Sequence, residues 1–224
     1  MRVQALRLAR RYRHEINAVT IVEDRQTAGD EAARLNIARR AMIDGQLRTS
    51  GVNAEPVLRR MAEVERERFV PGAARGFAYI DRAITLDGGR QLAAPVVQGM
   101  MLQEADPSPR DKALLVDGGS GYLAELFRPL VGTLEVLAPD DAVAPSRKRG
   151  EFTLLVIDGA VEQLPDTLVR RLADDARVVT GVVGNGITRL AVGRKAAGAV
   201  ALLPLAELGI PVLPEFTAPK GWSF

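Results

Sequence analysis

Residues 114–122 read Leu-Leu-Val-Asp-Gly-Gly-Ser-Gly-Tyr, and this stretch decides the fold that we predict for the chain. An apolar run leads into a cluster of glycines, and Tyr122–Phe127, which can form a helix, follows directly. This order predicts a β-strand, a tight turn and an α-helix. Glycines in such a turn let a cofactor approach the backbone closely, and the following helix offers free N–H groups at its start. We therefore expect an α/β protein with a ligand site at this turn.

The turn departs from the usual pattern of a cofactor loop at two positions. Such a loop reads acid-x-Gly-x-Gly-x-Gly, but Leu115 stands at the position of the acid and Asp117 at that of the first glycine. A residue other than glycine resists a backbone with positive φ at such a position. We expect Gly118, Gly119 and Gly121 to form the tight turn between strand and helix whether or not a ligand binds there.

The composition excludes several kinds of active site. The 224 residues carry a formal net charge of +2, contain no Cys and contain one His, His14, in a basic segment. The lack of Cys rules out disulfides, thiolate metal sites and a Cys nucleophile, and a single His does not favour a Ser–His–Asp triad or a metal site. The nearly balanced charge gives no reason to expect nucleic acid as a partner. No apolar run approaches the ~18 residues of a membrane span and no signal peptide is visible, so we expect a cytoplasmic protein.

The first 36 residues differ from the rest and are predicted to form an N-terminal extension. Five Arg residues lie between Met1 and Arg13, and residues 23–31 are polar. One interpretation is a basic arm that binds nucleic acid or a membrane surface; the other is a flexible tail, or the product of an upstream start codon. We favour the tail, because the segment has no consistent apolar face that could pack on a core.

Beyond residue 36 the apolar pattern alternates between helices and strands. Helices are expected over residues 35–47, after Asn53 as the N-cap of a second helix, over the buried run Val96–Leu102 and over Leu164–Leu172. Strands are expected at Ala113–Val116, Thr133–Leu137, Phe152–Ile157 and Arg177–Val183, followed by a hairpin of Ile187–Val192 with Ala199–Leu203. This order predicts a mostly parallel sheet in three layers with a C-terminal antiparallel hairpin. Ligands of such sheets lie beyond the carboxyl ends of the strands, where residues 117–121 and Asp158 fall.

Several polar side chains have a structural explanation beside a functional one. Asp158 can contact a ligand, but an acid at the end of a strand also hydrogen-bonds the turn that follows it. The remaining candidates are expected to be structural or solvated: Asp44 and Gln46 tying the first helix to the core, Arg66 and Arg68 on a solvated helix face, Asp81 as a turn acceptor that can order the next loop, and Glu162 as a solvated acid.

Five segments, in order along the chain, resemble the protein-L-isoaspartate O-methyltransferase family. Its N-terminal part is similar to residues 39–47 (RRAMIDGQL), 66–71 (RERFVP) and 78–81 (AYID), its later strand-end motif to 155–162 (LVIDGAVE), and its C-terminus to 211–214 (PVLP) with Trp222 and Phe224. The resemblance runs from about residue 37 to the end of the chain. An ordered series of motifs is far more specific than a glycine loop alone.

The resemblance implies a seven-stranded Rossmann-like fold that binds S-adenosylmethionine and methylates the carboxyl group of isoaspartyl residues in damaged proteins. It implies a methyltransferase-like domain over 37–224, with a helical part and a substrate-type loop over 37–105 and a Rossmann-like core over 106–224. The implied cofactor residues are Asp117, Gly118, Gly119, Ser120, Gly121 and Asp158, and the implied substrate loop is Gln91, Leu92, Ala93, Ala94 and Pro95. No catalytic side chain is assigned, because such a reaction depends mostly on positioning the two ligands. The oligomeric state is not assigned either.

The site motifs depart from the pattern of the family. Asp117 would bring a carboxylate toward the carboxylate of the cofactor. The acid expected on the cofactor's ribose falls near Ala138, and Asp140 comes two positions later. Gln91 and Ala93 stand where the family has Thr and Ser, so the hydroxyl that would contact the substrate is missing.

The connector Pro139–Gly150 is shorter than in the family, where a helix and a further strand follow the second strand. It must return along a strand of ~17–20 Å and step across two strand spacings of ~4.8 Å. A dozen residues at ~3.3 Å each span that distance only when they are fairly extended. We therefore predict a non-helical connector and a sheet that lacks one edge strand.

Three hypotheses for function follow from these patterns. The first is a protein-L-isoaspartate O-methyltransferase-like enzyme that uses S-adenosylmethionine and acts on isoaspartyl proteins. The second is a non-catalytic protein that keeps the methyltransferase fold for binding and has lost the cofactor. The third is a methyltransferase with a changed substrate and a rebuilt cofactor pocket. Binding of the cofactor separates the second hypothesis from the other two.

Overall fold

The computed structural model describes residues 29–218, and the chain divides after Arg40 into two compact units. Of the first unit, residues 29–40 are described, and they are helical. Most of the predicted N-terminal extension, and Trp222 and Phe224 at the other end, lie outside the described residues. The expected domain boundary after residue 36 therefore stays a prediction.

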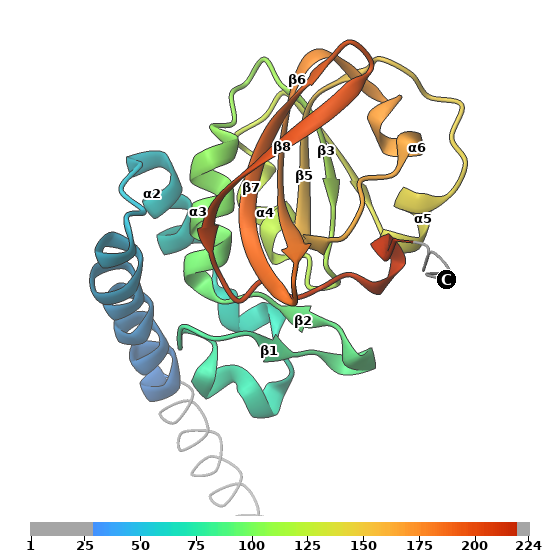
Figure 1. Cartoon of the computed structure of the whole chain (residues 1–224). Helices are drawn as coiled ribbons and strands as arrows, with labels where there is room; N and C mark the ends of the chain where they lie inside the picture. The colour runs from blue at the N-terminus through green and yellow to red at the C-terminus, as the bar shows by residue number, and fades with distance from the viewer. Residues whose placement is uncertain (1–28, 219–224) are drawn as a thin grey trace, which may run out of the picture. The chain divides into compact units, whose positions relative to one another are not determined.

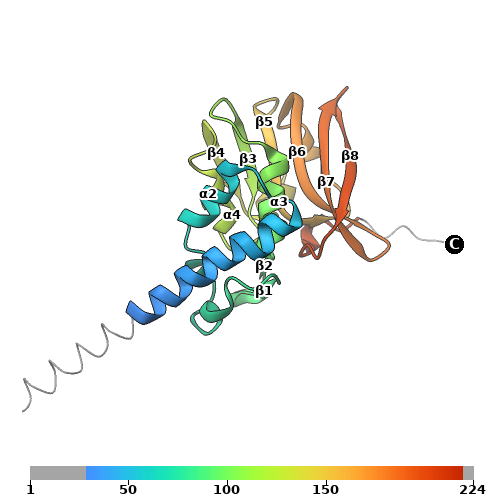
Figure 2. The ribbon, with the colours of Figure 1, turned by 90° about the vertical axis from the view of Figure 1, so that its left-hand side faces the viewer.

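The second unit is built around a six-stranded sheet in the order β4-β3-β5-β6-β7-β8 (Figures 1 and 2). The first four strands in this order are parallel, and β7 is antiparallel to both β6 and β8. This confirms the predicted parallel sheet with a C-terminal antiparallel hairpin. The strands are β3 (Lys112–Val116), β4 (Thr133–Leu137), β5 (Phe152–Val161), β6 (Leu172–Gly184), β7 (Ile187–Ala196) and β8 (Ala199–Glu207).

Short helices cover the parallel part of the sheet on both faces, so the fold has three layers. On one face lies α3 (Pro95–Ala105), which contacts β5, β6 and α4 (Tyr122–Phe127). On the other face, side chains of α5 (Pro139–Val143), α6 (Asp166–Val169) and η6 (Pro214–Phe216) join a core with alternate residues of β3 and β5. Burial from both sides explains why these central strands read as continuous apolar runs instead of alternating ones.

The start of α2 (Glu55–Glu63) differs from the prediction that Asn53 caps it. The N-cap is Ala54, and no side chain of the cap makes a hydrogen bond there. Instead, the backbone N–H groups of Asn53 and Ala54 donate to Oε1 of Gln103, at 2.8 and 3.0 Å. Gln103 belongs to α3, so the start of α2 is fixed by a contact across about 50 residues, which local sequence does not reveal.

The connector after β4 contains a helical turn, α5, so the prediction of a non-helical connector was wrong. A helix advances only 1.5 Å per residue, and the five residues of α5 are short enough for the extended segment before β5 to complete the return. No strand follows α5 among the described residues of this connector, and β4 stays at the edge of the sheet. The described sheet therefore has six strands against the seven that the resemblance implies.

Several elements extend beyond their predicted bounds or fall short of them: β6 begins at Leu172, β7 ends at Ala196 and β8 ends at Glu207. The strand β5 does not end before Asp158 but continues to Val161, through an irregularity in its pairing with β6 between Val156 and Ala160. Beyond the irregularity, Ala160 also pairs with Val212, which brings the C-terminal segment beside the end of β5. The helix expected over residues 164–172 shortens to the four residues of α6, because β6 already begins at Leu172.

Candidate functional site

The carboxyl ends of β3 and β5 bring the glycine loop, residues 117–121, against Asp158. A Cβ added at Gly118 would lie 2.3 Å from the carbonyl oxygen of Asp158, far closer than two such atoms can approach. Only glycine therefore permits the loop to cross the end of β5 at this position. The structure thus brings together the glycine loop and Asp158, where the sequence predicted a site, although Asp158 lies within β5 and not at its end.

Asp117 acts as the internal hydrogen-bond acceptor of the glycine loop. Its two carboxylate oxygens accept hydrogen bonds from the N–H groups of Gly119, at 3.0 Å, and Gly121, at 2.9 Å. Positive φ occurs at Gly119 (110°) and Gly121 (74°), and not at Asp117, so the expected backbone strain at Asp117 was wrong. Burial raises the pKa of Asp117 above its usual value, while these two hydrogen bonds and the charge of Arg90 oppose the rise.

Ser120 shapes the other end of the loop. Its hydroxyl oxygen accepts a hydrogen bond from the backbone N–H of Tyr122 at 3.1 Å, just where α4 begins. The ring of Tyr122 is fully buried and meets the edge of Phe69, with 5.3 Å between the ring centroids. Side chains within the loop and its surroundings therefore hold the turn in place without a ligand.

A fully buried arginine, Arg66, lies beneath this loop, and the prediction of a solvated position for it was wrong. Its Nε donates to the carbonyl of Ala78 at 2.7 Å, its Nη1 to Oε1 of Gln98 at 2.6 Å, and its Nη2 to the carbonyl of Ala93. The guanidinium also lies 5.0 Å from the ring centroid of Tyr122. Arg68, two residues further on, is exposed as expected.

Gln98 connects the hydrogen-bond network of Arg66 to Asp158. Its Nε2 lies 3.3 and 3.1 Å from the two carboxylate oxygens of Asp158, which is 4% exposed. Burial raises the pKa of Asp158 to about 7, and the nearby charge of Asp117 adds to the rise, while the hydrogen bond from Gln98 and the charge of Arg66 oppose it. The carboxyl group of Asp158 is directed into the protein, so it ties β5 to α3 and is not offered to a ligand.

The predicted substrate loop, residues 91–95, lies next to the glycine loop. Gln91 and Leu92 form β2, which pairs with β1 (Ile84–Thr85), and of residues 91–95 only Gln91 is exposed. The carboxylate of Asp81 accepts a hydrogen bond at 3.3 Å from the N–H of Val96, in the first turn of α3. Asp81 therefore orders the end of this loop, while Ala93 and Ala94 contribute no polar side chain.

A cavity of about 320 Å³ opens between these loops and the C-terminal segment. It is lined by the turn 88–91, Gly118 and residues 211–214. The side chain of Arg90 crosses Gly119, whose added Cβ would lie 2.9 Å from Cγ of Arg90. Arg90 also forms a bidentate ion pair with Glu215, with Nη1–Oε2 at 3.1 Å and Nη2–Oε1 at 2.5 Å. These hydrogen bonds raise the pKa of Arg90 and lower that of Glu215.

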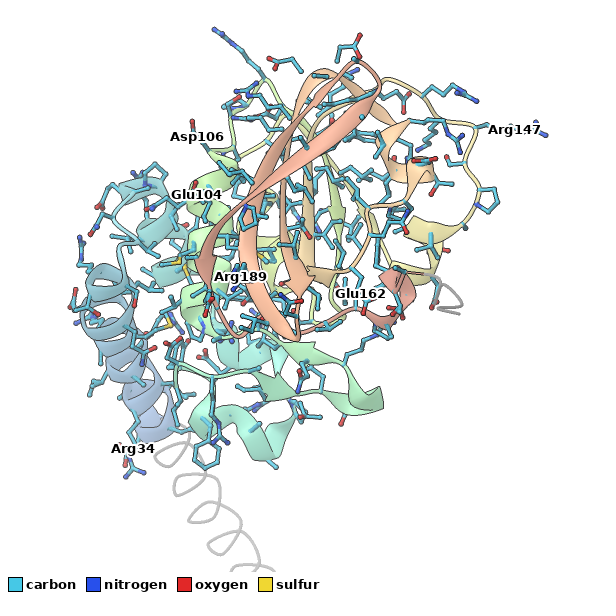
Figure 3. The ribbon with its side chains drawn as sticks, in the orientation of Figure 1. Arg34, Glu104, Asp106, Arg147, Glu162 and Arg189 are labelled. Carbon is cyan, nitrogen blue, oxygen red and sulfur yellow. The ribbon has the colours of Figure 1, made fainter. Side chains whose placement is uncertain are left out.

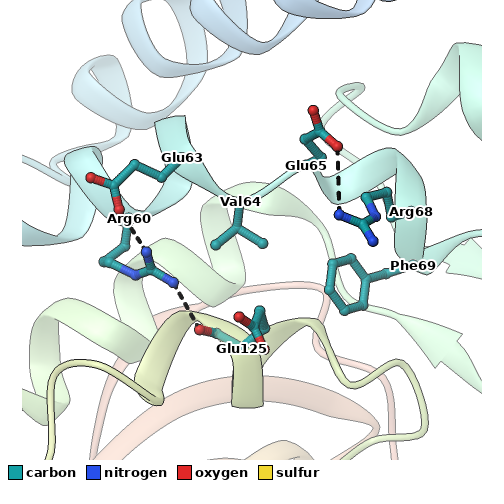
Figure 4. Close-up of a pocket in the computed structure, with 7 residues that line it drawn as sticks. All are labelled: Arg60, Glu63, Val64, Glu65, Arg68, Phe69 and Glu125. Carbon is teal, nitrogen blue, oxygen red and sulfur yellow. Dashed lines mark hydrogen bonds and ion pairs between the residues drawn. The ribbon is translucent and has the colours of Figure 1, made fainter.

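A second cavity of about 640 Å³ lies between the end of α2 and α4 (Figure 4). Arg60 pairs there with Glu63 at 2.6 Å and donates to the carbonyl of Glu125 at 3.0 Å. The other charged side chains of its lining also have partners, Arg68 with Glu65 and Glu125 with Arg128. The lining holds two arginines and three glutamates, all of them paired, so this cavity offers no cluster of charges of one sign to an ionic ligand.

Gln46 and Glu162 have the structural and the solvated role predicted for them, whereas the prediction that Asp44 ties the first helix to the core was wrong. Gln46 donates to the carbonyl of Tyr79 at 2.9 Å, and Asp44 forms an exposed pair with Arg48 at 3.5 Å. Glu162 is exposed near the end of the described chain, where it accepts a hydrogen bond from the N–H of Ala218 at 2.9 Å (Figure 3). Residues 29–218 contain no group of three or more metal-ligating side chains and no helix able to cross a membrane.

Sequence reasoning missed Gln98, Arg90 and Glu215. Gln98 interrupts a helix that was predicted to be buried, and a polar residue in such a run is a detectable sign of a buried hydrogen-bond network. The pair of Arg90 with Glu215 joins residues 125 positions apart, for which one sequence carries no signal.

The Rossmann-like sheet with a glycine loop at the carboxyl ends of its strands defines the class of the protein, the methyltransferase fold. Two solved structures named as protein-L-isoaspartate O-methyltransferases align with a TM-score of 0.65. The first, described as a putative enzyme from Plasmodium falciparum in complex with S-adenosyl-L-homocysteine, is 17% identical, and the match covers 79% of this chain and 98% of that one. The second is 14% identical, with 80% and 67% covered.

Sequence comparison identifies the family. The family model of protein-L-isoaspartate(D-aspartate) O-methyltransferase matches residues 38–138. A relative from Koribacter versatilis named protein-L-isoaspartate O-methyltransferase is 32% identical over 184 residues, which cover 71% of this chain and 83% of the relative. A relative of the same name from Herpetosiphon aurantiacus is 30% identical over 168 residues, 64% of this chain and 75% of the relative. The chain belongs to the protein-L-isoaspartate O-methyltransferase family.

S-adenosylmethionine is the methyl donor of this family, but the loop conformation does not fit it in the way that the family implies. The N–H groups of Gly119 and Gly121, which could receive the carboxylate of the cofactor, are already bound by Asp117. Arg90 lies over Gly119 on the side of the cavity. Ala138, at the end of β4, offers no acid to a ribose. A cofactor would have to displace at least one of these internal contacts.

Proposed function

We propose that this chain catalyses the reaction of its family, the transfer of a methyl group from S-adenosylmethionine to the carboxyl group of isoaspartyl residues in proteins. The family match carries the proposal, because it spans both the substrate-type loop and the glycine loop. The convergence of these loops beside one cavity supports it. Isoaspartyl-containing proteins or peptides would then be the partners of the chain.

The chemistry requires positioning more than proton transfer. An isoaspartyl carboxylate is ionised at neutral pH and is itself the nucleophile, so no general base is required. The site must hold that carboxylate in line with the methyl group and exclude water. Gly118, Gly119 and the backbone of residues 91–95 are our candidates for contact with the two ligands, and Gln91 is the candidate polar side chain. Asp158 is excluded from this set, because its buried carboxylate is engaged by Gln98.

A methyl-transfer assay tests the proposal. The full chain is incubated with S-adenosylmethionine labelled in its methyl group and a peptide containing one isoaspartyl residue, with the normal aspartyl peptide as control. We expect base-labile methyl ester on the isoaspartyl peptide alone. The absence of both methyl ester and cofactor binding would contradict the proposal and favour a fold kept without catalysis.

A pair of glycine variants shows whether the methyl transfer occurs at the glycine loop. Gly119 and Gly186 both have positive φ, 110° and 75°, so an added side chain strains either backbone. A Cβ at Gly119 would also meet Arg90, whereas a Cβ at Gly186 meets nothing within 4 Å. We expect Gly119→Ala to reduce transfer at least tenfold and Gly186→Ala, in the turn between β6 and β7, to leave it unchanged.

A further inference from the structure

The cavity beside the glycine loop contains one arginine whose guanidinium already binds a carboxylate. Arg90 comes from the turn before the substrate loop, crosses Gly119 and meets both oxygens of Glu215. Glu215 belongs to η6 and directly follows the segment 211–214, which lines the same cavity. A guanidinium with two parallel N–H···O bonds is the geometry by which proteins recognise a carboxylate.

The surroundings of Arg90 explain why the internal carboxylate matters for binding. The negative charges of Glu215, Asp140 and Asp117 all act on Arg90, so a further carboxylate would be repelled while Glu215 remains in place. The side chains of Arg90 and Glu215 are 30% and 14% exposed, so the pair borders solvent and can exchange partners. By contrast, the loop N–H groups that could receive a carboxylate are held by Asp117.

We propose that Arg90 is the carboxylate-binding residue of this cavity and that Glu215 occupies it as an internal substitute, which a ligand carboxylate must displace. The inference rests on the proposed function for the ligands it concerns. Two ligands of the family carry such a group: the amino-acid end of the cofactor and the free carboxylate of an isoaspartyl residue. Arg90 lies between the glycine loop and the substrate loop, so either source can reach it, and the test separates them.

The test compares ligands that carry the carboxylate with related ligands that lack it. Calorimetry measures binding of S-adenosylhomocysteine and of 5′-methylthioadenosine, which lacks the amino-acid end. It also measures an isoaspartyl peptide and the same peptide with that carboxyl converted to an amide. Each titration is run on the wild-type chain, Glu215→Gln, Arg90→Gln, Arg90→Lys and Glu207→Gln. The last variant is the matched control, because Glu207 also pairs with an arginine, Arg189, at 2.5 Å, at the far edge of the sheet.

We expect Glu215→Gln to bind the carboxylate-bearing member of at least one pair at least tenfold more tightly, with no change for its neutral partner. Arg90→Gln should remove the preference for the carboxylate, Arg90→Lys should retain part of it, and Glu207→Gln should match the wild type. The pair of ligands that responds identifies the source of the carboxylate. Melting curves for every variant confirm that the fold is kept.

Three outcomes would overturn the inference: equal gains for both members of each pair, a preference that survives Arg90→Gln in a folded protein, and no binding of either carboxylate to Glu215→Gln. Failure of the proposed function appears separately, in the methyl-transfer assay. Methyl transfer without any effect of Glu215→Gln leaves the proposed function standing. A carboxylate preference without methyl transfer would contradict the proposed function and leave the role of Arg90 in carboxylate binding standing.

Discussion

Arg66 lies against Tyr122, which follows the glycine loop, and Arg90 lies against Gly119 within it, but the surroundings of the two arginines differ. Arg66 is completely buried, and its three bonded nitrogens meet two carbonyls and the side chain of Gln98. Arg90 uses two nitrogens to bind Glu215, lines a cavity and is 30% exposed. A cation enclosed by fixed acceptors supports the fold, whereas a cation beside open space can exchange its carboxylate for that of a ligand.

The largest effect is expected from Arg66. Arg66→Met removes three hydrogen-bond donors and leaves Gln98 and two carbonyls without their partner, so we expect a loss of about 3–5 kcal/mol in the free energy of unfolding. Urea denaturation of the whole chain measures it. Arg68→Met is the control, because that side chain is exposed, and it should change stability by less than about 0.5 kcal/mol. Similar losses in both variants would remove the distinction between the buried and the exposed arginine.

The next effect depends on pH and concerns Asp158. Its pKa is about 7 in the folded protein, against about 3.9 in an unfolded chain, so the folded state binds more protons between these values. Stability should therefore fall as the pH rises from about 4 to 7 and then level off. Asp158→Asn resembles the protonated acid and should be more stable than the wild type at pH 8, on the order of 2–4 kcal/mol, with little difference at pH 4.

Denaturation midpoints across this pH range decide the prediction for Asp158. A variant that is less stable than the wild type at pH 8 would show that the ionised carboxylate stabilises the network. In that case the charge of Arg66, and not burial, would dominate the environment of Asp158.

A smaller effect is expected on cofactor affinity from the glycine loop. Asp117 blocks two loop N–H groups and brings a negative charge, which at ~4 Å costs a second carboxylate about 1 kcal/mol in water and ~4 at an effective dielectric of 20. We expect the wild type to bind S-adenosylmethionine only weakly, and Asp117→Gly combined with Ala138→Glu to bind it at least tenfold more tightly, each tenfold gain being about 1.4 kcal/mol. Calorimetry on both proteins tests this, and equal or weaker binding by the double variant would contradict it.

The smallest effect on stability should come from breaking the ion pair of Arg90 with Glu215. Arg90→Gln is expected to lower the free energy of unfolding by no more than about 1 kcal/mol, because a partly exposed ion pair contributes little. Arg189→Gln, which breaks the exposed pair with Glu207, provides the comparison and should behave alike. A loss near that of Arg66→Met would assign Arg90 to the fold instead of to binding.

The sequence predicted the parts of the structure that depend on local pattern. The apolar runs that became β3, β4 and β5, the hairpin of β7 with β8, and the buried helix α3 were all found in order. Alternation and apolar continuity report which side of an element is buried, and burial drives the fold. The sequence also predicted that the glycine loop and Asp158 lie close together, because parallel strands end at one edge of the sheet.

The contacts that define the site were not predictable from pattern. Arg66 stands between two charged neighbours in Glu65–Arg68 and reads as a solvated face, yet it is fully buried. Its partners come from residues 12 to 32 positions later, in three different segments. The expected backbone strain at Asp117 was wrong for a different, local reason: its side chain accepts hydrogen bonds from its own loop, and the positive φ values fall on the glycines.

By itself, then, the sequence determined the layered α/β fold, the glycine turn at the end of β3 and the family to which the chain belongs. Only the tertiary structure decided which charges surround that turn: the buried network of Arg66, and the pair of Arg90 with Glu215. The physical reason is the distance along the sequence between the residues that make contact. Strands, helices and turns follow from residues a few positions apart, whereas the environment of a charge depends on segments up to 125 residues away that meet only when the sheet has formed.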